Sequence, residues 1–423
     1  MKKEPILICL YAYYPFENAN TNVMLPIINA LSEEYEVHIL TENRDNTAPH
    51  EEITSEGIYI HRYPCMSKFQ KQFHNLVRLD TKKQRTILKS ILINILSPIA
   101  KKMDEHNLFL HPEYVMIRSL MEKTSFRFVM TTCANFDSHR NMLRYKLEND
   151  FNTPWISYFM DPFAFYIENC DIKGDLLQLE MRVYEKCDLV LVTEEIYEEN
   201  HHNELCIYLD KTKPVKFGNF TLEEMPLIND IFIPDKINCV YVGSLLNERI
   251  RDPRMFYRLI DLVDDRFMFH IICNNVSADN KRLFNEIVRE KEKVRWYHNL
   301  PLAECKGIMN TADILINLGN KTTNQTPSKV FDYIGTGKPI INLCSIEPDT
   351  SKKYLQNYPL VLNLIDSQCT DNDIVTEFTS FATRFRGVAA SKDEINKKYA
   401  AYKSENVTQK TLHILKTAIE ENI

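Results

Sequence analysis

Short, continuous apolar runs recur along the chain, and stretches with helical periodicity separate most of them. The first run, PILICLYA at 5–12, has the composition of a parallel strand that is covered on both faces. It is followed by a polar loop at 13–22 and by a helical pattern at 23–35. In this half of the chain the pattern predicts strands at 5–12, 36–41, 57–63, 126–132, 154–160 and 189–193. Strands that alternate with helices in this way predict a parallel α/β sheet.

The same alternation restarts after an acidic, proline-bearing segment at 222–236, which we interpret as a linker. Beyond it we predict strands at 237–245, 268–274, 294–300, 313–319 and 338–344. The fold class is therefore α/β, with two doubly wound parallel-sheet domains, 1–222 and 223–399, and a final helix within 400–423 that returns to the first. Because ligands of such sheets bind beyond the carboxyl ends of the strands, two facing sheets would form a cleft between the domains.

Composition narrows the functional classes only slightly. The 423 residues are 44% hydrophobic and 26% charged, as in a globular protein, and a net charge of −7 gives no reason to expect binding to nucleic acid. The eleven cysteines form no CxxC pair, which favours reduced thiols. We recognise neither a signal peptide nor an apolar window of the ~18 residues that a membrane span needs, so we expect a cytoplasmic protein. The pair His201-His202 lacks ligand spacing, and no metal site is expected.

The stretch NQTPSKVFDYIGTGKPII, at 324–341, has the pattern of a helix that could hold an anion. Thr326 can cap the helix, and Pro327 suits the first helical position, where its missing N–H costs nothing. The next amides would point outward with the helix dipole behind them, and Lys329 adds a full positive charge. Asp332 lies one turn further and could accept hydrogen bonds from hydroxyl groups of the same ligand. Taken alone, the pattern fits an ordinary helix N-terminus equally well.

A second stretch, VYVGSLLNERIRDP, places further basic residues at the end of another strand. Gly243 and Ser244 follow the strand, and Arg249 and Arg251 lie in the loop after them. Both loops belong to the carboxyl ends of parallel strands, so we expect them to open toward one ligand. An arginine fork together with a helix N-terminus suits a diphosphate and does not require a metal.

With these motifs the sequence resembles glycosyltransferase family 4, whose members have the GT-B fold. The matching pieces extend through nearly the whole chain: LYAYYPFENANTNVMLPIINALSEEYEVHILT, TTCANFDSHRNMLRYK, TPWISYFMDPF, YEKCDLVLVTEE, VYVGSL and TPSKVFDYIGTGKPII. The resemblance implies retaining transfer of a sugar from a nucleotide diphosphate donor, without a metal. It also implies that the C-terminal domain binds the donor and the N-terminal domain the acceptor.

The resemblance assigns donor-side roles to particular residues. Arg249 or Arg251, together with Lys329, would hold the diphosphate, and Asp332 would bind the ribose. Asn324 would face the donor sugar, with an amide where the family usually has a glutamate. The neighbouring residues on the donor side are Gly243, Ser244 and the segment Gln325, Thr326, Pro327 and Ser328, whose backbone would approach the sugar and the phosphates.

On the acceptor side, the resemblance points to three residues of the first half. His139 would lie near the reacting sugars and donate to a hydroxyl group or orient the reacting oxygen; the alternative is a capping or surface histidine. Asp161, in MDPF, would line the acceptor side, or serve only in a turn. Asn20 lies in the loop ENANTN, which contains no glycine where many family members have several. Asparagine tolerates left-handed backbone, so this loop could still approach a ligand.

A basic segment lies within 68–102 of this acidic chain. Its apolar residues form one helical stripe, which predicts either contact with a membrane surface or packing on the sheet beneath a solvated basic face. A polyprenyl-linked acceptor would give such a membrane contact a purpose. The basic residues are Lys68, Lys71, Arg78, Lys82, Lys83, Arg85, Lys89, Lys101 and Lys102, with Asp80 as the one acid among them.

The function predicted from the sequence is retaining transfer of a sugar from a UDP- or GDP-type donor to a glycan or polyprenyl-linked glycolipid. Surface polysaccharide synthesis is the expected setting. One alternative is a catalytically inactive, glycosyltransferase-like binding or scaffold protein, which the asparagine at 324 and the loop without glycine favour. Another is a nucleotide-sugar epimerase on the same fold. An inverting mechanism would need a base against the acceptor hydroxyl, and His139 is the candidate for it.

Overall fold

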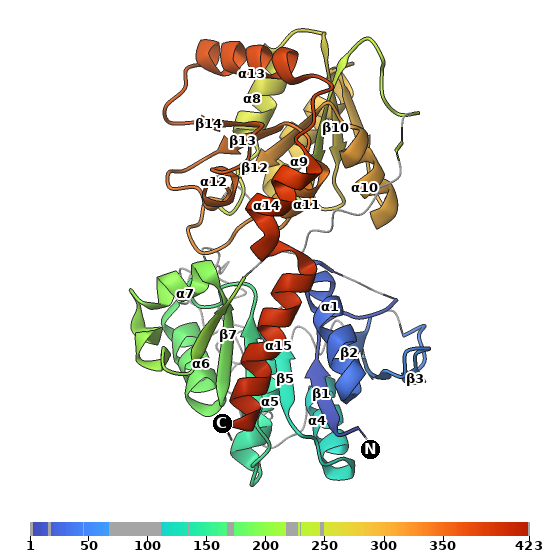
Figure 1. Ribbon diagram of the computed structural model, residues 1–423, viewed down its shortest axis with the longest axis vertical. Coiled ribbons are helices and arrows are strands. Elements are labelled where there is room, and N and C mark those ends of the chain that lie inside the picture. The colour runs from blue at the N-terminus through green and yellow to red at the C-terminus, as the bar shows by residue number, and fades with distance from the viewer. Residues whose placement is uncertain are drawn as a thin grey trace, which may run out of the picture. The chain divides into compact units, whose positions relative to one another are not determined.

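The computed structural model describes residues 3–15, 18–44, 46–66, 111–132, 136–166, 173–216, 227–228, 230–245 and 249–421. The chain divides into two compact units (Figure 1). Unit 1 comprises Met1–Val215 and Thr408–Ile423, and unit 2 comprises Lys216–Val407. The basic segment 68–102 lies outside the described residues. So do 222–226 and Asn229 of the predicted linker.

The described strands of unit 1 form one sheet in the order β3-β4-β2-β1-β5-β6-β7-β8. All neighbours pair in parallel except β3, which runs antiparallel to β4 at the edge. The chain winds from β1 first to one side and then to the other, so the switch point lies between β1 and β5. The strands are β1 (Pro5–Cys9), β2 (Glu36–Asn43), β3 (Glu51–Ile53), β4 (Tyr59–Pro64), β5 (Val129–Thr132), β6 (Trp155–Phe159), β7 (Leu189–Thr193) and β8 (Thr212–Val215).

The faces of this sheet are covered by helices, which is why its central strands are almost fully buried and mainly apolar. Along β6, Trp155 and Phe159 belong to a core cluster that also takes buried side chains from α4, α5, α6 and α7. Helix α15 joins unit 1 through its later residues, where Lys416 forms an ion pair with Glu34 of α1. The helices are α1 (Ala19–Glu34), α4 (Pro112–Lys123), α5 (Asp137–Glu148), α6 (Lys173–Lys186), α7 (Glu194–Asn200) and α15 (Ser404–Glu420), with a 3₁₀ helix at Glu204–Tyr208.

The described strands of unit 2 are all parallel and follow the order β11-β10-β9-β12-β13-β14. This is the doubly wound order in which the switch point lies between the first strand and the fourth, here between β9 and β12. The strands are β9 (Ile237–Val242), β10 (Phe267–Ile272), β11 (Val294–Tyr297), β12 (Ile314–Leu318), β13 (Ile340–Cys344) and β14 (Val361–Ile365). The prediction of two doubly wound parallel-sheet domains is confirmed.

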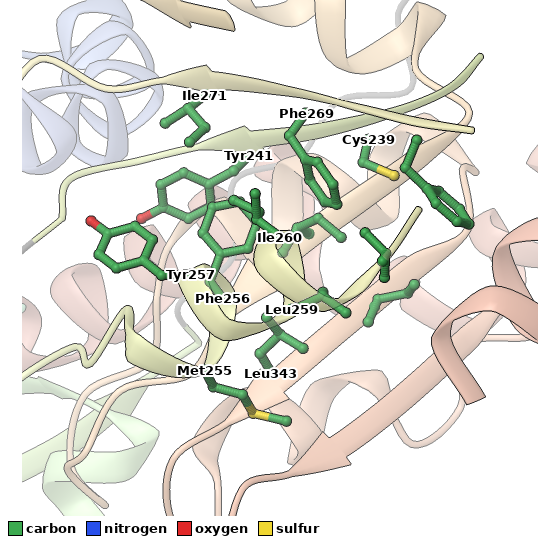
Figure 2. Packing of buried hydrophobic residues seen from close by; sticks show 14 of the residues in the cluster. Cys239, Tyr241, Met255, Phe256, Tyr257, Leu259, Ile260, Phe269, Ile271 and Leu343 are labelled. Atoms are coloured by element: carbon green, nitrogen blue, oxygen red, sulfur yellow. The ribbon is translucent and has the colours of Figure 1, made fainter. Parts of the chain in front are cut away.

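Alternate residues of β9 enter two different core clusters of unit 2. Cys239 and Tyr241 pack with α8, α9 and α13, whereas Val240 and Val242 pack with α10, α11, α12 and α14. Figure 2 shows the first cluster, in which the ring of Phe256 contacts those of Tyr241 and Phe269. The helices are α8 (Arg254–Leu262), α9 (Ala278–Glu290), α10 (Leu302–Thr311), α11 (Lys329–Thr336), α12 (Thr350–Leu355), α13 (Asp371–Phe385) and α14 (Lys392–Tyr399), with a 3₁₀ turn at Ala400–Tyr402.

Two predicted helix starts are wrong by a few residues. Helix α1 begins at Ala19, inside the predicted loop, because Asn18 and Thr21 form a reciprocal capping box. Helix α11 begins at Lys329 rather than Pro327, although Pro327 O already accepts from the Val330 amide in a tighter first turn. The helix ends at Thr336, and Gly337 follows with a left-handed backbone, φ +74°.

None of the described helices combines the length and the apolar character that crossing a membrane requires.

Candidate functional site

The predicted donor-side residues lie at the carboxyl ends of neighbouring strands in unit 2. β9 leads into Gly243 and Ser244, and β12 leads into Gly319 and the loop that ends at α11. The chain reverses its winding direction between these two strands, and in doubly wound sheets ligands bind beyond the carboxyl ends of the strands at such a switch point.

Arg251 contacts Ser244, close to the end of β9. The Ser244 carbonyl accepts hydrogen bonds from Tyr241 Oη, at 2.9 Å, and from Arg251 Nη1, at 3.2 Å. A side chain at Gly243 would place its Cβ 2.9 Å from Tyr241 Oη. Burial raises the pKa of Tyr241 to about 12, so its hydroxyl remains a proton donor to this carbonyl at neutral pH.

Arg251 is also connected to the loop before α11. Its Nε donates to Asn320 Oδ1 at 3.0 Å, and Asn320 Nδ2 donates to the Gln325 carbonyl at 3.0 Å. The same carbonyl accepts from Thr350 Oγ1 at 3.1 Å. Of the two arginines that the sequence offers, the structure therefore brings Arg251 into this cluster, whereas Arg249 is exposed.

Helix α11 is fixed to β9 next to this cluster. The Tyr333 hydroxyl accepts from the Val242 amide at 2.8 Å and donates to its carbonyl at 3.3 Å. At the start of the helix, Lys329 Nζ lies 2.7 Å from Asp332 Oδ2, and both side chains are partly exposed. Among the described residues, no hydrogen bond uses the amide of Lys329 or that of Ser328. This end of α11 therefore has a lysine paired with an aspartate and two backbone amides, a combination that suits an anionic ligand.

Asn324, the residue that replaces the expected acid, is buried in the same loop. Its Oδ1 accepts a hydrogen bond from Thr322 Oγ1. Its backbone N–H donates back to Thr322 Oγ1 at 3.3 Å. Thr326 and Pro327 are buried beside it, and Gln325 and Ser328 are half-buried. The loop is thus held by Thr322 from within and by Arg251 and Thr350 from outside it.

His139 lies in the first turn of α5 and is completely buried in unit 1. Its Nδ1 shares a hydrogen bond of 2.7 Å with Thr131 Oγ1, and its ring stacks on Phe159 with a centroid separation of 4.5 Å. Burial lowers the pKa of His139 to about 3, so the imidazole is neutral at physiological pH. The interpretation as a capping or surface histidine is wrong. Nε2 has no hydrogen-bond partner among the described residues.

Asn20 and Asp161 meet at the carboxyl edge of the unit 1 sheet. Asn20 Nδ2, in the first turn of α1, donates to Asp161 Oδ2 at 3.3 Å. Both side chains are half-buried, and Asp161 lies two residues beyond the end of β6. The structure thus brings these two predicted acceptor-side residues together, while His139 lies on α5, which follows β5.

Two residues of the cluster around Arg251 and Gln325 in unit 2, Asn320 and Thr350, were not predicted from the sequence. Asn320 carries a recognisable signal, because it is a polar residue directly after the run predicted as a strand at 313–319. Thr350 has no such signal, since it follows a different strand and reaches Gln325 only through the fold. No group of three or more histidine, cysteine, aspartate or glutamate side chains within the described part of the chain is arranged to hold a metal ion.

Glu180 was also missed, and it supports the segment that contains Asp161. It is buried on α6, and its Oε2 accepts from the Ala164 amide at 2.9 Å. Burial, with a smaller contribution from Glu199, raises the pKa of Glu180 to about 7. The folded protein therefore holds this proton more tightly than the unfolded chain, and the resulting stabilisation is lost as the pH rises through 7.

We expect Glu180→Gln to remove most of this pH dependence, because the amide oxygen can still accept from Ala164 without ionising. From pH 5 to pH 8 the wild type should lose about 2.5 kcal/mol of unfolding free energy relative to the variant. Urea denaturation at several pH values measures the difference. A constant difference between the two proteins would show that Glu180 titrates normally.

No family model and no curated protein matches this chain. Solved structures do resemble it over nearly its whole length. Sucrose-phosphate synthase from Thermosynechococcus elongatus is 13% identical, with a TM-score of 0.68 and coverage of 99% of this chain and 100% of the other. Anabaena HepE in complex with UDP and glucose is 10% identical, with a TM-score of 0.61 and coverage of 98% and 100%.

A third similar structure is the lipopolysaccharide outer core galactosyltransferase WaaB, at 13% identity, a TM-score of 0.56 and coverage of 99% and 100%. At these identities the likeness concerns the fold. The chain has the GT-B fold of these glycosyltransferases, with two doubly wound α/β domains.

Proposed function

We propose that this protein is a retaining glycosyltransferase of the family 4 type. It would move a sugar from a UDP- or GDP-type donor to a glycan or polyprenyl-linked glycolipid, without a metal, in surface polysaccharide synthesis. The observation that carries the proposal is the cluster at the ends of β9 and β12, where Arg251 and the start of α11 are joined through Asn320.

The chemistry of this cluster suits a nucleotide diphosphate. A diphosphate carries at least two negative charges, and Arg251, Lys329 and the amides of Ser328 and Lys329 supply cations and N–H donors for it. Asp332 would exchange its ion pair with Lys329 for hydroxyl groups of the ribose. Support for a nucleotide sugar as substrate also comes from HepE, which has a similar fold and binds UDP.

The transfer step needs few groups of the protein. The bond between the sugar's anomeric carbon and the phosphate oxygen breaks, the acceptor oxygen attacks on the same face, and its proton passes to the departing phosphate. Asn324 would lie near the donor sugar, and a neutral His139 would serve as a hydrogen-bonding group rather than a cation. Asn20 and Asp161 would belong to the acceptor side.

The acceptor and the setting rest on the family resemblance. The fold is also similar to that of WaaB, a galactosyltransferase of the lipopolysaccharide outer core, which is consistent with a lipid-linked acceptor. The basic segment 68–102 would then contact the anionic surface of a membrane.

The proposal is tested by thermal stabilisation with UDP-, GDP-, ADP- and dTDP-sugars, each with and without EDTA. We expect one nucleotide to raise the melting temperature selectively and independently of EDTA. Lys329→Ala should weaken its binding by about 20-fold, because a charged hydrogen bond contributes about 2 kcal/mol.

Lys352→Ala is the matched control for this test, since Lys352 is a partly exposed lysine of the same unit that pairs with Glu347. It should bind the nucleotide as the wild type does. Equal weakening in both variants, or stabilisation that EDTA removes, would contradict the proposed site. Nucleotide binding without transfer to any acceptor would instead favour the inactive scaffold.

A further inference from the structure

Asn320 uses both ends of its amide to connect two separate parts of the proposed donor site. It is buried, with 1% of its surface exposed, and lies two residues beyond the end of β12. Its oxygen accepts from Arg251 Nε at 3.0 Å, and its nitrogen donates to the Gln325 carbonyl at 3.0 Å. A weaker approach of 3.4 Å joins the same nitrogen to Gln325 Oε1.

The contact with Arg251 fixes the orientation of a flexible side chain. A free arginine side chain has many rotamers, and a ligand must overcome this entropy unless the protein has already ordered the guanidinium. Two N–H groups of Arg251 already have acceptors: Nε donates to Asn320 Oδ1, and Nη1 donates to the Ser244 carbonyl. The remaining donors of the planar group are then oriented before any ligand arrives.

The contact with Gln325 fixes the backbone that leads to α11. Gln325 lies three residues before Ser328, whose amide is one of the two N–H donors at the start of this helix. Its carbonyl accepts from Asn320 on one side and from Thr350 Oγ1 on the other. Rotation of this peptide would therefore break two hydrogen bonds of buried side chains.

We propose that Asn320 is a positioning residue that sets the Arg251 guanidinium and the 325–328 backbone in the arrangement that binds a diphosphate. This inference rests on the proposed function. An amide is required because one end must accept from a cation while the other donates to a carbonyl. Aspartate would keep the first contact and repel the Gln325 carbonyl, and leucine would lose both.

The test is calorimetric titration with UDP and, in parallel, with GDP. Asn320→Leu should raise the Kd of the nucleotide that binds by about 10-fold. Asn320→Asp should raise the Kd further, because the new carboxylate would neutralise the Arg251 guanidinium, whose positive charge the diphosphate needs. Asn238→Leu is the control: Asn238 is a buried amide at the opposite end of the sheet, where it contacts the backbone at Ile233 and Lys236.

Coupling between Asn320 and Arg251 distinguishes a positioning residue from a merely structural asparagine. If Asn320 acts in part through the guanidinium, Asn320→Leu should weaken nucleotide binding less in the Arg251→Met variant than in the wild type, because only its effect on the 325–328 backbone remains. We expect Asn238→Leu to lower the melting temperature and leave the Kd unchanged. Additive effects of the two substitutions, or equal effects at 238 and 320, would overturn the inference while the proposed function stands. A wild type that binds neither nucleotide overturns both.

Discussion

Replacement of Arg251 by methionine is expected to raise the Kd for the bound nucleotide diphosphate by about 100-fold. Methionine keeps much of the length of the side chain and removes its charge and all of its N–H donors. An ordered guanidinium that pairs with a phosphate contributes up to about 3 kcal/mol, and this contribution would be lost. Calorimetric titration with UDP and GDP measures the change directly.

Two further arginine variants make this prediction specific. Arg249→Met tests the other arginine of the same loop, and we expect a smaller effect because Arg249 is exposed and Arg251 contacts Ser244 and Asn320. Arg266→Met controls for the loss of charge alone. Arg266 lies just before β10, at the amino ends of the strands and away from the site, and pairs with Asp264. If Arg249→Met has the larger effect, the diphosphate lies further out along the loop than we propose.

Replacement of Gly319 by alanine is expected to destabilise unit 2 by about 4 kcal/mol. The new Cβ would lie 2.0 Å from Asp349 Oδ2 and 3.4 Å from the Leu343 carbonyl. Asp349 cannot easily move away, because its Oδ1 caps α12 at the Lys352 amide and accepts from Asn342 Nδ2. The change therefore combines an overpacked core, which costs about 1 to 3 kcal/mol, with a weakened helix cap, which costs about 0.5 to 2 kcal/mol. Urea denaturation measures the loss.

The matching control is Gly174→Ala in α6, where the added Cβ would meet no atom within 4 Å. It should leave the unfolding free energy unchanged or raise it slightly, because alanine is the better helix former. Asp349→Ala should remove most of the additional cost of Gly319→Ala, since it deletes the atom that clashes. If Gly319→Ala unfolds at the wild-type urea concentration, Asp349 has room to move and the close contact is not important for stability.

The agreement between sequence and fold is best where a strand is buried on both faces. The run 189–193 was predicted with the bounds that β7 has, because a parallel strand buried on both faces is a nearly continuous apolar run. The edge strands β3, β8 and β14 were not predicted. β8 has two exposed residues and a proline, and β14 is only half-buried over its first three positions. Their pairing depends on neighbours that are distant in the sequence.

The helix starts show where local chemistry was underestimated. The polar composition of ENANTN suggested a loop, but Asn18 and Thr21 satisfy each other's backbone amides and begin α1 inside it. That capping box is a local signal and was available in the sequence. Burial of His139 was not, since a histidine in a polar segment gives no indication that Phe136 and Phe159 will enclose its ring.

For the candidate site, the sequence established which kinds of groups are present: a lysine and an aspartate one turn apart on a helix, arginines in a loop, and strands that end beside both. These follow from local patterns because periodicity, glycines and prolines act within a few residues of one another. Which arginine is held, and by what, depended on the fold. Asn320 and Thr350 approach Gln325 only because parallel strands bring their carboxyl ends to one edge of the sheet. Contacts across a sheet depend on the order of its strands, and no local pattern encodes that order.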